Sequence, residues 1–149
     1  MGSAQSQLRF LPDPLKGLGV YANYTYTDSD AVFPGLTGEN STLPGQSKNV
    51  GNLSIFYELG GFTARFAANF HGSYVDQVAS TAGEDRFYDS HTQLDFSVAQ
   101  RITRNVRVFF DALNLTDAPL RYFEGVVDRP LQEEHYRSWF DFGVKVDWP

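Results

Sequence analysis

The chain has 149 residues, which predicts one domain that is long enough to bury a sizeable core. Its net charge of −6 excludes a general binder of the nucleic-acid backbone, so we expect no nucleic-acid partner. The absence of cysteine excludes disulfides, thiolate metal sites and thiol catalysis. Aromatic residues make up 15% of the chain while the mean hydropathy is −0.34, which indicates large rings alternating with polar residues.

We expect neither a transmembrane helix nor an N-terminal export signal in this sequence. No stretch approaches the 18 or more apolar residues of a transmembrane helix. Residues 1–7 lack the basic start and apolar centre of a secretory signal, so we expect no signal peptide there. Residues 1–3, Met-Gly-Ser, are typical of a cloning remnant.

Alternation of apolar and polar residues predicts an all-β chain with seven strands and no amphipathic helix. Several of the alternating runs are long enough to cross a hydrocarbon core, which takes about 9–11 tilted residues. The expected strands, in chain order, cover residues 5–11, 18–27, 52–59, 62–74, 93–99, 106–113 and 139–148.

The connections between these strands alternate between short and long. Short turns are expected at 12–17, 60–61 and 101–104, and long loops at 28–47, 76–87 and 116–136. In an antiparallel meander all short turns then lie at one end and all long loops at the other, as in outer-membrane barrels. We therefore predict a single domain over residues 1–149, built as a meander of seven or eight long antiparallel strands in a closed or partly closed β-barrel.

The two faces of the predicted strands differ in charge. One face is rich in Phe, Tyr, Val and Leu, and the other carries mixed charges. This pattern fits a membrane barrel with a polar lumen as well as a soluble sandwich with a polar surface. Aromatic residues near strand ends, Tyr24, Tyr26, Tyr74 and Trp148, favour the membrane barrel, because such girdles mark the interfaces. The side chains expected to face the lumen, and to hold the register through cross-strand ion pairs, are Arg65, Asp95, Arg107, Asp111, Asp141 and Lys145.

Several segments resemble a known family. Residues 18–27, LGVYANYTYT, followed by 43–49, LPGQSKN, resemble the late barrel strands of TonB-dependent outer-membrane receptors. Residues 108–117, VFFDALNLTD, resemble the end of their penultimate strand, and 121–144 resemble their last loop and last strand.

The resemblance covers about residues 5–148 and implies the C-terminal barrel portion of such a receptor, without the plug domain or the TonB box. Complete barrels of this kind have 22 strands and a plugged lumen. The resemblance further implies a parent protein in the bacterial outer membrane that takes up an iron chelate, cobalamin or a glycan. The chain alone would not be competent for transport, and its partners would be outer-membrane lipid or detergent.

A seven-stranded sheet leaves two unpaired edges, which invite pairing. Three outcomes stay open at this stage: a parallel contact between the first and last strands, an eighth strand from residues 121–127, or edge pairing in a homodimer.

A different function is conceivable from three polar side chains that share one face. His71, Ser73 and Asp95 would suit a small soluble barrel that binds or slowly hydrolyses a small molecule, in the manner of an esterase. However, His71 and Ser73 would lie about 6–7 Å apart along a strand, and the chain has no Gly-x-Ser-x-Gly elbow. We therefore expect no catalytic site, and the alternative that stays open is a weak hydrolase.

The remaining candidates are histidines and loop residues. The spacing of His71, His91 and His135 matches no metal-ligand motif, so we expect no metal site and no cofactor. The long loops hold residues suited to an anionic or sugar-like small molecule, although packing at the rim explains them equally well. These candidate ligand-binding residues are Arg121, Tyr122, Arg129 and Tyr136.

Overall fold

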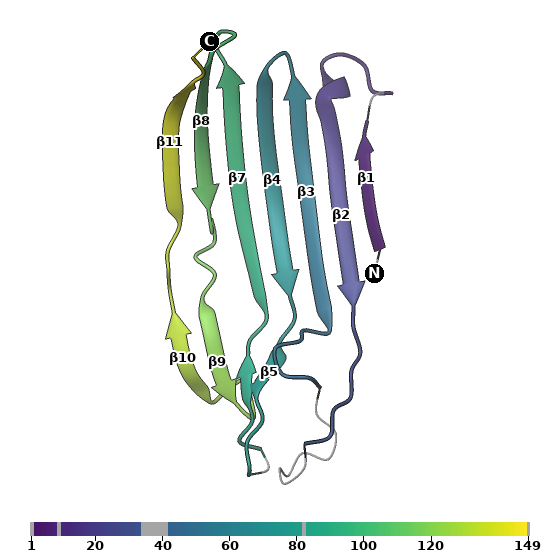
Figure 1. Ribbon diagram of the computed structural model, residues 1–149, viewed down its shortest axis with the longest axis vertical. Helices are drawn as coiled ribbons and strands as arrows, with labels where there is room; N and C mark the ends of the chain where they lie inside the picture. The colour runs from purple at the N-terminus through teal and green to yellow at the C-terminus, as the bar shows by residue number, and fades with distance from the viewer. Residues whose placement is uncertain (1, 9, 34–41, 82, 149) are drawn as a thin grey trace.

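The computed structural model describes residues 2–8, 10–33, 42–81 and 83–148, and in them it shows one long antiparallel sheet with a smaller sheet beyond one end (Figure 1). The main sheet has seven strands in the order β1–β2–β3–β4–β7–β8–β11. Their bounds are Gly2–Gln7 (β1), Leu18–Tyr26 (β2), Asn49–Leu59 (β3), Phe62–His71 (β4), His91–Arg101 (β7), Val106–Leu113 (β8) and Trp139–Val146 (β11).

Sequential strands pair as a meander, as the alternation predicted. The turn between β3 and β4 consists of Gly60 and Gly61, with φ angles of 61° and 86°. Positive φ at both central residues defines a type I′ turn, whose twist suits a tight hairpin. The short turns gather at one end of the main sheet, at the top of Figure 1, and include the 3-10 helix η1 (Leu15–Gly17).

The first strand differs from the prediction in its position. It covers Gly2–Gln7 rather than 5–11, and it pairs with β2 from Gly2 opposite Tyr24 to Gln7 opposite Gly19. The chain already turns after β1, because the amide of Leu11 donates to the carbonyl of Leu8 over 3.1 Å. The two prolines that follow, Pro12 and Pro14, suit the turn into η1 better than a continued strand.

The long connections hold four short strands, of which the sequence had suggested only the one within residues 121–127. These are β5 (Tyr74–Gln77), β6 (Arg86–Tyr88), β9 (Leu120–Glu124) and β10 (Pro130–Glu134). They form a second sheet in the order β10–β9–β6–β5, called the end sheet below. Its core contains the buried side chains of Val75 and Phe123, and the Phe123 ring stacks on Phe87 at 5.2 Å. Strands of three to five residues are too short to give an alternation signal.

The main sheet stays open between its two edges. Residues 121–127, one source considered for an eighth strand, instead contribute to β9, which pairs with β6 and β10 in the end sheet. Within the described residues, β1 and β11 each pair with one neighbour only. The predicted all-β antiparallel meander is confirmed, and of the two predicted forms, closed or partly closed, the unclosed sheet agrees with the partly closed one.

The register gives the main sheet one continuous apolar face. Phe66 on β4, for example, lies between Ile55 on β3 and Phe96 on β7. Large side chains of this face stay open: Phe66 is 41% exposed and Phe142 is 81% exposed. The central rows of the face contain Val20, Ala22, Leu53, Ile55, Phe66, Ala68, Leu94, Phe96, Phe110, Ala112, Phe140 and Phe142.

Among the described residues, no second layer covers either face of the main sheet. The chain has an accessible surface of 10008 Å², whereas a compact monomer of its mass would have about 7,600 Å². Among the described residues the buried apolar side chains number only four, Val75, Ala99, Ala112 and Phe123. None of the helical structure in the described ranges is long and apolar enough to span a membrane.

Three of the four expected girdle residues lie at the ends of the apolar face. Tyr24 and Tyr26 are at the end of β2 nearest the long connections, and Trp148 follows β11 at the opposite end; all three are more than half exposed. Tyr74 is the exception, because it belongs to β5 in the end sheet and stacks on Tyr88.

Candidate functional site

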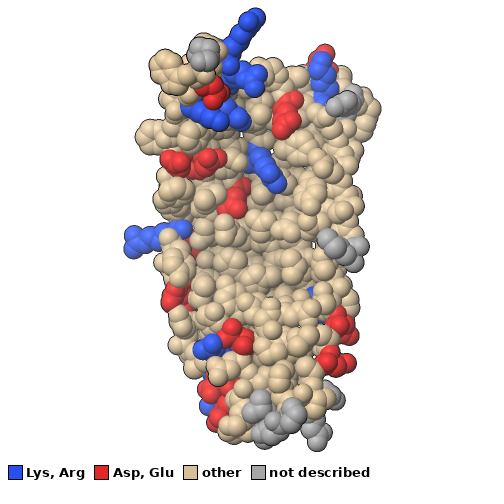
Figure 2. All heavy atoms as spheres, viewed as in Figure 1, with Lys and Arg blue, Asp and Glu red and all other residues tan. Residues whose placement is uncertain are grey.

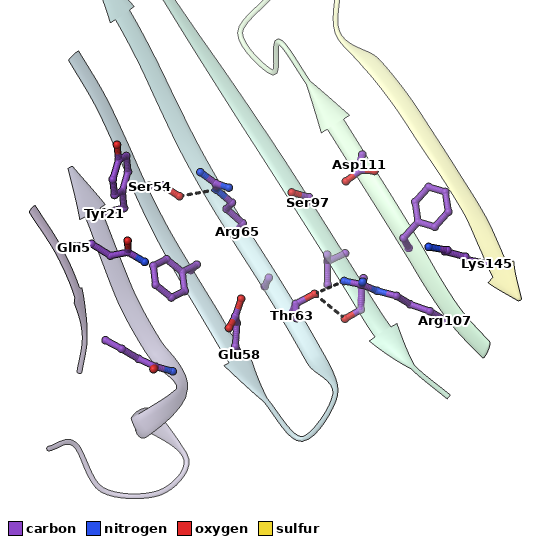
Figure 3. A pocket seen from close by; sticks show the side chains of 16 residues that line it. Gln5, Tyr21, Ser54, Glu58, Thr63, Arg65, Ser97, Arg107, Asp111 and Lys145 are labelled. Atoms are coloured by element: carbon purple, nitrogen blue, oxygen red, sulfur yellow. Dashed lines mark hydrogen bonds between the residues drawn. The ribbon is translucent and has the colours of Figure 1, made fainter. Parts of the chain in front are cut away.

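The polar face of the main sheet forms a groove of about 770 Å³ that reaches from β1 to β11 (Figure 3). Gln5 lies at one side of it and Lys145 at the other. The charged residues that line this polar groove are Glu58, Arg65, Arg107, Asp111 and Lys145. On the face seen in Figure 2, charged side chains gather over the upper half and around the end sheet, with a mostly uncharged band between them.

Two arginines of the groove are held against the sheet by hydroxyl groups. The Arg65 Nε donates to Ser54 Oγ over 2.7 Å, and Ser54 is only 3% exposed. The Arg107 Nη2 donates to Thr63 Oγ1 over 3.2 Å. Because each guanidinium keeps further donors free, these contacts orient the cations without neutralising them.

The register places like charges side by side in the groove. Arg107 lies opposite Arg101 on β7 and opposite Lys145 on β11, and Asp111 lies opposite Asp141. These residues therefore do not form the expected cross-strand ion pairs within the described chain. The ion pair that Lys145 does form is with Asp147, two positions along the chain, with 3.9 Å between Nζ and Oδ1. Like charges directly opposite one another destabilise a sheet pair, so this face carries uncompensated charge.

Asp95 lies on the same face but serves a structural purpose. Its carboxylate accepts hydrogen bonds from the Gln93 side chain (2.9 Å), the Asn69 side chain (3.4 Å) and the backbone amide of Asn114 (3.0 Å). Asn114 has a φ of 52° where the chain leaves β8, a conformation that asparagine tolerates better than most residues. Asp95 therefore fixes the turn that follows β8.

The structure does not bring the three catalytic candidates together. His71 lies opposite His91, whereas Asp95 lies opposite Ala67, four residues further along β4. Four strand residues correspond to roughly 13 Å. Ser73 follows β4 outside any strand. With Asp95 engaged by three donors as well, no serine–histidine–acid arrangement forms.

The four candidate ligand-binding residues all lie on or beside the end sheet, but they differ in how free they are. Arg121 is committed to the fold: its Nη1 is 3.3 Å from Asp89 Oδ2 and its Nη2 donates to the carbonyl of Val127 over 2.8 Å. Its Nε is 3.7 Å from Glu133 Oε2, beyond hydrogen-bond range. Arg129 and Tyr136 are exposed, and the Tyr136 hydroxyl donates to the Glu134 carboxylate.

Rings from the main sheet and the end sheet meet in an aromatic cluster made of His71, Tyr74, Tyr88, His91 and Tyr122. The Tyr88 ring centroid is 5.1 Å from that of His71 and 5.2 Å from that of Tyr74. Tyr122 meets Tyr88 edge-on at 5.0 Å. Burial raises the pKa of Tyr74 and of Tyr88, so both phenols stay protonated at neutral pH. Sequence reasoning missed this cluster because the end sheet that assembles it was not predicted.

His135 stands apart from the other two histidines. Its Nδ1 is 3.2 Å from Asp117 Oδ2 and its Nε2 is 3.1 Å from Glu133 Oε1. The hydrogen bond to Glu133, together with that to Asp117, raises the pKa of His135. Among the described residues there is no group of three or more His, Asp or Glu side chains arranged to hold a metal ion.

A long antiparallel meander with one exposed apolar face, one charged face and short turns at one end is the architecture of membrane β-barrels. Comparison with protein families agrees: the family described as TonB dependent receptor-like, beta-barrel, matches residues 3–115. The chain belongs to this family of outer-membrane receptor barrels. Comparisons with curated proteins and with solved structures found no match.

Proposed function

We propose that this chain is the C-terminal barrel portion of a TonB-dependent receptor in the bacterial outer membrane. Its parent would take up an iron chelate, cobalamin or a glycan, and the chain alone would not transport. The observation that carries the proposal is the apolar face, which crosses all the central strands of the main sheet and which no part of the described chain covers. Soluble monomers rarely expose an apolar patch beyond about 300–600 Å².

The apolar face is suited to contact with lipid. Moving a Phe, Leu or Ile side chain out of water is favourable by roughly 1.5–3 kcal/mol, and the central rows of the face hold many such side chains. The exposed Tyr24, Tyr26 and Trp148 at its two ends would lie at the membrane interfaces. By the general architecture of these barrels, the short turns would face the periplasm and the end sheet the outside.

The polar groove would face the lumen of the complete barrel. Its rows of like charge, Arg101–Arg107–Lys145 and Asp111–Asp141, support this placement. Such rows are unfavourable in a sheet on its own and call for opposite charge from outside the sheet. The rest of a receptor, its other strands and its plug, would supply that charge.

The uptake ligand would first bind at the end sheet. Arg129 and Tyr136 are exposed there, and Tyr136 is 68% exposed. An arginine offers paired donors to an anionic group, and a tyrosine offers ring area. Fluorescence titration with a ferric chelate, cobalamin and an oligosaccharide should detect one binder. Arg129→Ala and Tyr136→Ala should weaken it, and unchanged binding in both variants would contradict this assignment.

The unpaired edges β1 and β11 would pair with neighbouring strands in the complete receptor. When the chain is made alone, we propose a homodimer in which β1 of one copy pairs with β11 of the other. Unpaired strand edges are templates for such pairing. Since the chain has no cysteine, mixing a Gln5→Cys variant with a Lys145→Cys variant allows a disulfide test of this contact. Failure to cross-link at any concentration would argue for a monomer.

The membrane assignment is tested by size exclusion with and without detergent. The chain should elute as a defined monomer or dimer in detergent and should aggregate without it. A defined monomer in plain buffer would mean that the apolar face is buried inside the molecule, and it would overturn the proposal. Co-flotation with phospholipid vesicles is the second measurement, and the soluble alternative predicts that the chain stays at the bottom of the gradient.

A further inference from the structure

The strand register brings together two histidines that are twenty positions apart in the chain. His71 ends β4, His91 begins β7, and the two are direct partners across the pair of strands. Their rings stack with centroids 5.7 Å apart and planes inclined by 16°. Both lie on the polar face, half-buried, where the main sheet meets the end sheet.

Hydrogen bonds to the backbone fix the same tautomer in both rings. The Nδ1 of His71 is 3.1 Å from the carbonyl oxygen of Gly72, and the Nδ1 of His91 is 3.1 Å from that of Pro119. A carbonyl oxygen only accepts, so each Nδ1 must carry the hydrogen. In the neutral ring each Nε2 then carries a free lone pair, and within the described residues neither Nε2 has a hydrogen-bond partner.

This is the arrangement in which histidine binds metal ions. A ligating imidazole typically donates its other N–H to a backbone carbonyl or a carboxylate, which orients the ring and raises its basicity. We propose that the His71–His91 pair binds a divalent transition-metal ion through the two Nε2 atoms, with water completing the coordination. The inference does not depend on which ligand the receptor takes up.

The geometry sets what binding requires. Metal–nitrogen distances of about 2.0–2.1 Å bring two ligating nitrogens within about 4 Å of each other. The ring centroids are 5.7 Å apart, so binding would tilt the distal ends of the two rings toward each other by side-chain rotation. Nε2 is at the distal end of the ring, where such a rotation moves it furthest.

The two imidazole ligands limit which metal ions the site would bind. Imidazole nitrogen suits Cu²⁺, Ni²⁺ and Zn²⁺, and Cu²⁺ binds most strongly in that series. Tyr88 and Tyr74 pack against His71 through their rings. With two protein ligands the site is open and reversible.

The direct test is titration of the full chain in detergent with CuCl₂, followed by calorimetry and by electron paramagnetic resonance. Wild type should show nitrogen hyperfine structure from two imidazoles. His71→Gln and His91→Gln should each weaken Cu²⁺ binding by about tenfold or more and lose the two-nitrogen signal. His135→Gln is the matched control, because His135 is engaged by Asp117 and Glu133, and it should bind as wild type does.

A second measurement needs no variant and so does not depend on how the variants fold. Cu²⁺ should protect His71 and His91, but not His135, from acylation by diethylpyrocarbonate, as read by mass spectrometry. Equal acylation of His71 and His91 with and without Cu²⁺ would overturn the proposal. Wild-type affinity in both His71→Gln and His91→Gln would do the same.

Discussion

An arginine placed at the centre of the apolar face gives the sharpest energetic test of where that face lies. Phe66 is in the middle of β4, between Ile55 and Phe96 in the register, and is 41% exposed. If lipid covers this face, Phe66→Arg should destabilise the folded chain by about 2–4 kcal/mol, the penalty for a cation near the bilayer midplane of a β-barrel. That corresponds to roughly a 30- to 700-fold shift in the folding equilibrium.

The neighbouring residue supplies the control. Ala67 follows Phe66 but points to the polar face, where it lies between Ser54 and Asp95 in the register. Ala67→Arg puts the same cation beside a carboxylate and should change stability by less than about 0.5 kcal/mol. Phe66→Ala measures how much stability is lost with the ring alone. This loss is subtracted from the effect of Phe66→Arg to give the contribution of the cation. The assay is urea unfolding in phospholipid vesicles followed by tryptophan fluorescence. An equal effect of Phe66→Arg and Ala67→Arg would refute the argument.

Three further predictions address the groove and the end sheet. Ser54→Ala removes the buried hydroxyl that accepts a hydrogen bond from Arg65, and it should lower the free energy of unfolding by about 1–3 kcal/mol. An unchanged urea midpoint would show that this hydrogen bond does not stabilise the fold. Asp141→Asn relieves the repulsion from Asp111 across the strand pair, so it should stabilise the isolated chain by about 0.2–1 kcal/mol, and a loss of stability would contradict the register. The pKa of His135 is raised chiefly by its hydrogen bond to Glu133, so the stabilisation from this contact is complete below about pH 6.5 and is lost as the pH rises through the raised pKa. Glu133→Gln should bring that pKa back down in an NMR titration, and an unchanged titration curve would exclude the contact.

The sequence predicted what is local and regular. Alternation over eight or more residues, as in Phe62–His71, identified the strands and assigned each side chain to a face, because the period of a strand is two. The Gly60-Gly61 pair marked a tight hairpin turn, and the alternation of short and long connections predicted the two ends of the sheet. These features need no knowledge of which residue lies opposite which.

The sequence could not predict what depends on register and on distant pairing. The strands of the end sheet are three to five residues long and exist because β6 pairs with β9, more than thirty positions away in the chain. The same limit hid the structural role of Asp95 at Asn114 and the pairing of His71 with His91. Ion pairs were expected because one face carries both positive and negative side chains. The register instead places residues of the same charge opposite each other.

The central claim is that the apolar face meets lipid and the polar face meets water, and a cysteine scan along β4 measures this directly. The chain has no cysteine, so single nitroxide labels can be placed at each position of Phe62–His71 in vesicle-reconstituted protein. Even-numbered positions should be relaxed by oxygen, which partitions into lipid, and odd-numbered positions by a water-soluble chromium chelate. Access of the chelate to both sets of positions alike would contradict the account.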